Sequence, residues 1–238
     1  MLTALCVSLS SLVAGTVQGV TGFGASIVMM LFFPYLFPVL RASALSSAIT
    51  LAATVSMTWA YRRHIHRELI LFPAVCYIVA TTAVLQYADR LPSDVILKVF
   101  GVFLIILSVY FVCFSGRLQL KATPATAAVC AAVSGVASGL FGIGGPPMVL
   151  YYLAALPEKE DYLGTIQAFF LLTNVYTLAF RVYKGYFTVD LLPMLLLGMA
   201  VIFLGNLIGQ KIINRINADL MRKVVYIFLG ITGVINLL

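Results

Sequence analysis

Long apolar runs separated by short polar connections dominate the hydrophobic pattern of the chain. In the first half the runs lie near residues 2–20, 24–39, 43–61, 69–88 and 96–115. In the second half they lie near 124–141, 146–157, 163–182, 188–209 and 221–238. Most approach the roughly 20 residues that a helix needs to cross a bilayer, and none alternates as a membrane β-barrel strand does. The pattern predicts an all-α, polytopic transmembrane helical bundle.

Composition agrees with a membrane protein. Of 238 residues, 62% are hydrophobic and 10% are charged, whereas soluble domains carry about 25% charged residues. The net charge of +7 comes from basic residues in the short connections, where they act as topology signals, and nucleic acid is not an expected partner. The first run has no basic stretch before it, so we expect a retained segment and not a cleaved signal peptide.

An internal repeat is visible when the chain is shifted against itself by 120 positions. The shift places one set of glycines on another: Gly15 on Gly135, Gly19 on Gly139, Gly22 on Gly142, and Gly24 on Gly144. Pro73 falls on Pro193 at the same shift, and Asp94 falls on Asp219 at a shift of 125. The chain is therefore interpreted as an N-terminal transmembrane repeat over 1–115 and a C-terminal one over 124–238, joined by a hydrophilic stretch near 115–123.

The distribution of basic residues favours inverted repeats. If the first two runs of each half form a hairpin or cross twice, one side of the membrane receives ten basic residues: Arg62, Arg63, Arg67, Arg117, Lys121, Lys159, Lys211, Arg215, Arg222 and Lys223. The other side receives five: Arg41, Arg90, Lys98, Arg181 and Lys184. Treating each pair of runs as one broken span gives a nearly even division, which the positive-inside rule disfavours. We expect inverted repeats with both termini on the outer face.

The two glycine motifs interrupt apolar runs, where glycine disfavours a helix by about 1 kcal/mol relative to alanine. Matching interruptions in two halves are the best sequence indication of a transporter's binding site. A helix that restarts within the bilayer offers unpaired N–H groups to a small anion, and Pro146 and Pro147 suit such a restart. Gln18, Ser26 and Ser138 add neutral polar groups. The alternative is close helix packing, which the four-residue spacing of Gly15 and Gly19 also favours.

Further polar residues lie inside the runs. Gln167 and Asn174 are two helical turns apart on one face, and the equivalent run of the first half carries Ser43, Ser46, Ser47, Thr50 and Thr54. Buried amides in a membrane helix line either an interhelical contact or a wet path. Arg41 either neutralises an anion or, as we favour, reaches toward the membrane surface.

Several functional groups are missing from the pattern. No Asp or Glu lies in the middle of a run, so a carboxylate proton relay has no candidate. His64 and His66 are interpreted as ordinary solvated loop residues. Cys6, Cys76, Cys113 and Cys130 have no metal-binding spacing, and we expect neither a metal nor a cofactor.

The stretches Gly15-Thr-Val-Gln-Gly-Val-Thr-Gly-Phe-Gly24 and Gly139-Leu-Phe-Gly-Ile-Gly-Gly-Pro-Pro147, with the duplication around them, resemble the sulfite exporter TauE/SafE family. The resemblance covers essentially the whole chain. It implies a multi-pass permease of the bacterial inner membrane for sulfite, sulfoacetate or related organosulfonates. We expect such a permease to work by alternating access. The resemblance also adds Gly19 and Gly139 to the site. The candidate substrate-binding residues are Gln18, Gly19, Gly22, Gly24, Ser26, Ser138, Gly139, Gly142, Gly144, Gly145, Gln167 and Asn174.

Two other classes remain as alternatives. A membrane assembly or chaperone subunit would not need duplicated broken helices, and a lipid-modifying enzyme would need a catalytic constellation that the runs lack. We therefore expect a transporter and not an enzyme. The expected partners are a small anion and membrane lipids, and a homodimer stays an open alternative.

Overall fold

The computed structural model describes residues 2–114 and 121–212, which form helices and no strand. The helices of the first half are α1 (Leu2–Thr21), α2 (Ala25–Met30), α3 (Val39–Ala60), α4 (Leu71–Tyr87) and α5 (Ser93–Phe114). Those of the second half are α6 (Pro124–Phe141), α7 (Gly145–Ala155), α8 (Lys159–Tyr183) and α9 (Leu192–Ile212). Short 3-10 turns cover Phe33–Tyr35, Arg62–His64, Arg67–Leu69, Ala88–Arg90 and Val189–Leu191. The all-α prediction is confirmed, while the run at 221–238 and most of the join near 115–123 lie outside the described residues.

Most helix bounds follow the apolar runs, with one clear exception. The run at 24–39 is divided into the six residues of α2 and the turn Phe33–Tyr35. Pro34 and Pro38 lack the N–H that would continue a helix, so this stretch is too broken to span a membrane as one element. By contrast, α6 starts cleanly, because the Thr123 hydroxyl accepts the N–H of Thr126 at 3.2 Å and Pro124 follows it.

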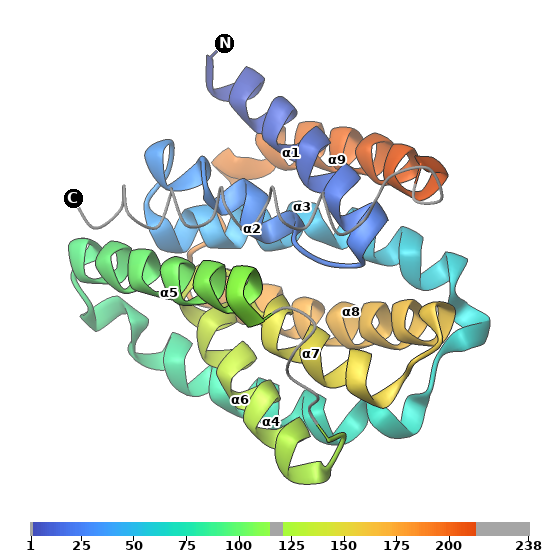
Figure 1. Ribbon diagram of the computed structural model, residues 1–238. Coiled ribbons are helices and arrows are strands. Elements are labelled where there is room, and N and C mark those ends of the chain that lie inside the picture. Colours follow the sequence, from blue (N-terminus) through green and yellow to red (C-terminus); the bar gives the residue numbers. More distant parts are fainter. Residues whose placement is uncertain (1, 115–120, 213–238) are drawn as a thin grey trace.

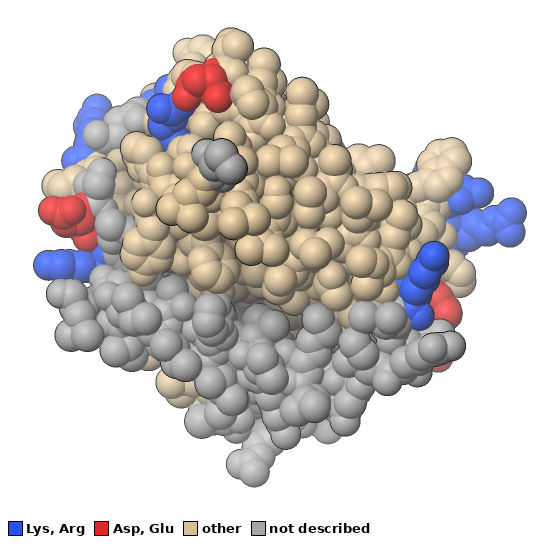
Figure 2. All heavy atoms as spheres, turned by 90° about the horizontal axis from the view of Figure 1, so that it is seen from above, with Lys and Arg blue, Asp and Glu red and all other residues tan. Residues whose placement is uncertain are grey.

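The surface of the molecule is that of a multi-pass membrane protein. Within residues 2–114 and 121–212, six helical segments are long and apolar enough to cross a bilayer: Leu2–Thr21, Val39–Ala60, Arg67–Tyr87, Pro124–Phe141, Lys159–Tyr183 and Val189–Lys211. Large apolar side chains face outward, such as Leu2, Leu5, Leu9 and Val13 along one face of α1, all more than half exposed. Figure 2 shows a broad uncharged face with Lys, Arg, Asp and Glu gathered toward its two sides. A bilayer would cover the uncharged band.

The helices pair in a way that relates the two halves. α1 packs along α9, α4 packs along α6, and α3 and α8 pack together between these pairs (Figure 1). The shift of 120 positions equates α1 with α6, α3 with α8, and α4 with α9, so it also equates the α1–α9 pair with the α4–α6 pair. An internal repeat predicts this pairing, and the inversion of the repeats relative to a membrane stays a prediction.

Glycines set the spacing within both helix pairs. A Cβ atom added to Gly15 would lie 2.2 Å from the carbonyl oxygen of Ile202 in α9, and one added to Gly135 would lie 2.5 Å from that of Tyr77 in α4. Gly19 and Gly139 are as confined, with added Cβ atoms 2.5 Å from Asn206 O and 2.9 Å from Val84 Cγ1. The four-residue spacing therefore brings the backbones of each pair into contact.

Candidate functional site

Both glycine motifs break a helix inside the bundle. α1 ends at Thr21, and the chain turns through Gly22 and Gly24, whose φ angles are +81° and +95°. α6 ends at Phe141 and turns through Gly142 at φ +71°. These left-handed conformations favour glycine because it has no Cβ. Gly144 is required for a different reason: its φ is −101°, but an added Cβ would lie 2.6 Å from the Tyr77 hydroxyl.

A cavity lies where the two breaks meet, with about 420 Å³ of empty space when its outward opening is included. Seven of the candidate residues predicted from the sequence line it: Gln18, Gly24, Ser26, Gly142, Gly144, Gly145 and Asn174. The remaining lining residues are Phe23, Ala25, Ile27, Thr50, Thr54, Tyr77, Ile143 and Phe170. None of the fifteen is Asp or Glu, so the cavity presents no carboxylate to a guest.

The other five candidate residues stand outside the lining. Gly19 and Gly139 belong to the helix contacts described above. Gly22 lies against the side chains of Leu163 and Gln167, with an added Cβ 2.6 Å from Leu163 Cδ2. Ser138 and Gln167 are buried behind the cavity, where each takes part in holding one of the breaks.

A chain of buried amides holds the first break. Gln167 of α8 donates a hydrogen bond from Nε2 to the carbonyl oxygen of Gly22. Its Oε1 accepts a hydrogen bond from Gln18 Nε2 at 3.4 Å, and Gln18 Nε2 also donates to Thr54 Oγ1 at 3.2 Å. The freed carbonyl at the end of α1 thus obtains a neutral donor from the other half of the chain, as a break inside a membrane requires.

Two helix starts and one amide side chain line the cavity. Ala25 is the first residue of α2 and Gly145 the first of α7, and both line the cavity. First-turn N–H groups have no partner within their own helix, although Pro146 and Pro147 leave Gly145 as the only donor among the first three residues of α7. None of the hydrogen bonds found in the described part of the chain uses the Asn174 amide, which also faces the cavity.

Two threonine hydroxyl groups of the cavity wall donate to helix carbonyls, whereas the Ser26 hydroxyl does not. Thr50 donates to Ser46 O at 2.7 Å, and Thr54 donates to Thr50 O at 3.1 Å. Because the Thr50 proton is in use, the 3.2 Å contact between Ser26 Oγ and Thr50 Oγ1 has Ser26 as its donor. Of these three, Ser26 is the hydroxyl that can turn its proton toward a guest without releasing a helix carbonyl.

Arg181 holds the second break, and sequence reasoning missed this role. Its side chain is 0% exposed. The Nη2 atom donates to the carbonyl oxygens of Ser138 (2.6 Å) and Gly139 (3.4 Å), and Nη1 donates to Ser43 O at 2.7 Å and to Ser47 Oγ. The guanidinium thus ties the carboxyl end of α6 to α3, with a cation at the negative end of the α6 dipole.

The position of Arg181 also places a positive charge beside the cavity. An added Cβ on cavity-lining Gly142 would lie 3.3 Å from Ser47 Oγ, the hydroxyl that Arg181 contacts. Among residues 2–114 and 121–212, no carboxylate forms an ion pair with Arg181, and its Nε atom has no hydrogen-bond partner. A buried charge without a counter-ion is costly. Its field therefore favours a negatively charged guest in the cavity.

Other candidate groups lie away from the cavity. Arg41, considered as an anion-neutralising residue, forms an ion pair with Asp190 and donates to Thr188 Oγ1 at 2.8 Å. Cys6, Cys76 and Cys130 are free thiols, whereas the Cys113 side chain is outside the description. Within the described ranges, no group of three His, Cys, Asp or Glu residues is arranged to hold a metal ion.

Comparison with known proteins agrees with the resemblance seen in the glycine motifs. A family model described as "Sulfite exporter TauE/SafE" matches residues 7–235. A curated protein of Cupriavidus necator, named "Probable sulfite/organosulfonate exporter TauE", is 24% identical over 226 residues, which cover 92% of this chain and 88% of that protein. No solved structure matches the chain.

Proposed function

Because the chain belongs to the sulfite exporter TauE/SafE family, we propose that this membrane protein moves sulfite or a small organosulfonate such as sulfoacetate across the bacterial inner membrane by alternating access. The observation that carries the proposal is the cavity between the two helix breaks, which has no carboxylate in its lining and a buried cation behind its wall. The protein acts as a permease and not as an enzyme. Lipids surround its apolar band, and it has no nucleic-acid partner.

The chemistry of the cavity suits a sulfite or sulfonate group. Such a group spreads its negative charge over three oxygens, and several neutral N–H donors match this distribution better than one fixed cation does. Ala25 and Ser26 of the first half and Gly145 and Asn174 of the second half line the cavity, and their N–H, hydroxyl and amide groups are the proposed donors to the anion. Arg181 contributes long-range attraction without forming a tight ion pair that would retain the anion.

The helix pairs suggest the moving units. Close backbone contact at Gly15 and Gly135 makes α1–α9 and α4–α6 two tightly packed pairs. Rocking of such pairs about the central helices α3 and α8 would expose the cavity to one side and then to the other. Outward movement of an anion needs no coupling ion, because the membrane potential favours it by about 2.3 kcal/mol per charge per 100 mV.

Counterflow in proteoliposomes tests the proposal. Vesicles loaded with unlabelled sulfite are expected to accumulate labelled sulfite or sulfoacetate transiently, and empty vesicles or vesicles loaded with an organic cation are not. Gly144→Leu, correctly inserted, is expected to abolish accumulation, since its side chain would displace Tyr77 from the cavity wall. Undiminished counterflow by this variant, or none by the unaltered protein with any sulfonate or carboxylate, would contradict the proposal. The second outcome would favour an assembly subunit without transport.

A further inference from the structure

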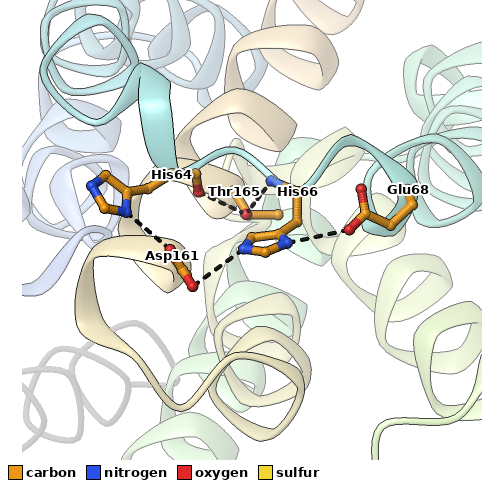
Figure 3. Close-up of polar contacts among 5 residues, drawn as sticks. All are labelled: His64, His66, Glu68, Asp161 and Thr165. Carbon is orange, nitrogen blue, oxygen red and sulfur yellow. Dashed lines mark hydrogen bonds and ion pairs between the residues drawn. The ribbon is translucent and has the colours of Figure 1, made fainter.

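His64 and His66 are solvent-accessible residues of the connection between α3 and α4, and they also form part of a polar network. Figure 3 shows both rings directed at Asp161, with Glu68 on the far side of His66. His64 Nδ1 lies 3.0 Å from Asp161 Oδ1, and His66 Nε2 lies 3.2 Å from Asp161 Oδ2. His66 Nδ1 lies 3.2 Å from Glu68 Oε1. We call His64, His66, Glu68 and Asp161 the histidine cluster.

The cluster joins the two halves of the chain at one end of the bundle. Its histidines and Glu68 belong to the connection between α3 and α4, and Asp161 belongs to the first turn of α8. Beneath the side chains, the His66 N–H donates to Thr165 Oγ1 at 3.0 Å, and an added Cβ on Gly164 would lie 2.6 Å from His64 O. The connection therefore sits directly on the amino-terminal end of α8, which also contacts the first break through Leu163 and Gly22.

The contacts of His66 favour the doubly protonated, positively charged ring. Neutral imidazole has one N–H donor and one unprotonated acceptor nitrogen, whereas an ionised carboxylate only accepts hydrogen bonds. Both ring nitrogens of His66 face a carboxylate oxygen, so both must carry hydrogen for the two contacts to be attractive. Hydrogen bonds to Asp161 and then to Glu68 correspondingly raise the pKa of His66 above its ordinary value.

Other charged side chains of the described chain lie near His66, but they do not contact its ring as Asp161 and Glu68 do. The same connection carries Arg62, Arg63 and Arg67, and the first turn of α8 carries Lys159 and Glu160. Arg62 turns away, with its guanidinium 4.6 Å from the centre of the Trp59 ring. Of the described residues, Asp161 and Glu68 are the charged groups that contact the His66 ring.

A different kind of contact joins the two halves of the chain at the opposite end of the α3–α8 pair. There Arg41, at the start of α3, pairs with Asp190 after α8, and the shift of 120 positions equates Arg41 with Asp161. The repeat thus places one contact between the halves at each end of the α3–α8 pair. Arginine keeps its charge at all physiological pH values, whereas histidine does not.

We propose that His66 is a proton-binding site, and that the bound proton holds the α3–α4 connection on α8 and keeps this end of the anion path closed. The inference rests on the proposed permease for the existence of a path with two ends. A proton bound more tightly in the closed state stabilises that state at low pH. This contribution is lost as the pH rises through the pKa of His66. The Arg41 end stays insensitive over the same range.

Accessibility of the cavity tests the inference without any anion. In a variant with Cys6, Cys76, Cys113 and Cys130 replaced by alanine, Thr50→Cys places one reporter thiol in the cavity wall. A membrane-impermeant maleimide is added to each face of proteoliposomes in turn, between about pH 5.5 and 8. Rates are compared with those of His66→Gln in the same background at the same pH, because thiol reactivity itself rises with pH.

On the face that carries His66, the protein with histidine is expected to be labelled about three- to tenfold more slowly than His66→Gln at acid pH and equally fast at alkaline pH. Asp161→Asn is expected to behave like His66→Gln. His66→Arg, which retains a cation between the two carboxylates, is expected to be labelled slowly at every pH. Arg41→Gln, at the other end, is expected to leave the pH dependence of the His66 face intact.

A labelling ratio independent of pH would overturn the inference. So would equally slow labelling of His66→Gln and the histidine protein at acid pH while His66→Gln keeps its melting temperature. If His66→Gln fails to fold, His66→Arg becomes the reference: the histidine protein is expected to be labelled as slowly as His66→Arg at acid pH and faster than His66→Arg at alkaline pH. Because labelling needs no substrate, its result does not depend on transport. A failure of the permease proposal would be seen in the counterflow experiment and not in the labelling rates.

Discussion

The two helix breaks have similar backbones and different chemistry. Both begin after a helix enters the bundle and both turn through a left-handed glycine, at Gly22 and at Gly142. The same helix, α8, holds both: Gln167 donates to the end of α1, and Arg181 donates to the end of α6. These anchors are about 21 Å apart along α8 at 1.5 Å per residue. One anchor is neutral and the other is a cation.

The difference shows how two helix breaks with similar backbones acquire different electrostatic character. A repeat supplies two places where a helix can stop, and the side chain that satisfies the freed carbonyls decides the local charge. With a neutral amide at one break and a guanidinium at the other, the electrostatic potential of the cavity is more positive on the α6 side. An anion would lie closer to Gly142 than to Gly22.

Replacing the charged anchor is expected to have the largest effect. Arg181→Gln removes the hydrogen bonds that the guanidinium donates to the carbonyl oxygens of Ser43, Ser138 and Gly139, and it removes the positive charge. We expect the free energy of unfolding to fall by about 1.5–3 kcal/mol, as the loss of hydrogen bonds to a charged group does. We also expect that sulfite or a sulfonate no longer raises the melting temperature of the variant. Thermal unfolding in detergent, with and without the anion, measures both quantities.

Arg181→Lys is the matched control, because it keeps the charge and loses the fork of donors. It is expected to lose stability as well, but to retain part of the stabilisation by the anion. If Arg181→Gln folds and the anion stabilises it as much as the unaltered protein, the charge of Arg181 has no role in binding, and the two breaks are equivalent in this respect.

The second prediction compares two adjacent glycines of the second break. An alanine Cβ at Gly144 would meet the Tyr77 hydroxyl at 2.6 Å, whereas at Gly145 the nearest atom would be 3.5 Å away. We expect Gly144→Ala to destabilise the protein by about 1–3 kcal/mol, as overpacking does, and Gly145→Ala to change stability little. Equal melting temperatures for the two variants would show that Tyr77 moves aside freely.

The architecture follows largely from the sequence, because runs of apolar residues have few places to go except across a bilayer. The runs at 2–20 and 124–141 match α1 and α6 almost residue by residue. The run at 24–39 does not form one helix, because hydrophobicity alone does not register the missing N–H groups of Pro34 and Pro38. The repeat pattern also located both left-handed turns.

The site was harder to predict than the fold, because it depends on contacts between residues that are distant in sequence. Gly19 and Gly24 belong to one motif, yet Gly24 lines the cavity and Gly19 packs against α9. Spacing along a chain does not separate these two uses. Arg181 lies two residues before the end of α8 and therefore reads as a topology signal. Its burial depends on the carbonyls of Ser43 and Ser138, which are distant in sequence.

The smallest expected effect concerns the neutral anchor. Gln167→Met has a similar volume and removes the hydrogen bonds to Gly22 O and from Gln18. Because loss of a neutral buried hydrogen bond costs about 1 kcal/mol, the melting temperature is expected to fall less than in Arg181→Gln, and the anion is expected to stabilise the variant almost normally.

Gln167→Glu changes the charge instead of the shape: a carboxylate beside the first break would oppose the field of Arg181, so the stabilisation by the anion is expected to disappear. If Gln167→Met abolished anion binding as completely as Gln167→Glu, the first break would contribute through its hydrogen bonds and not through its neutrality, and the contrast between the two anchors would fail.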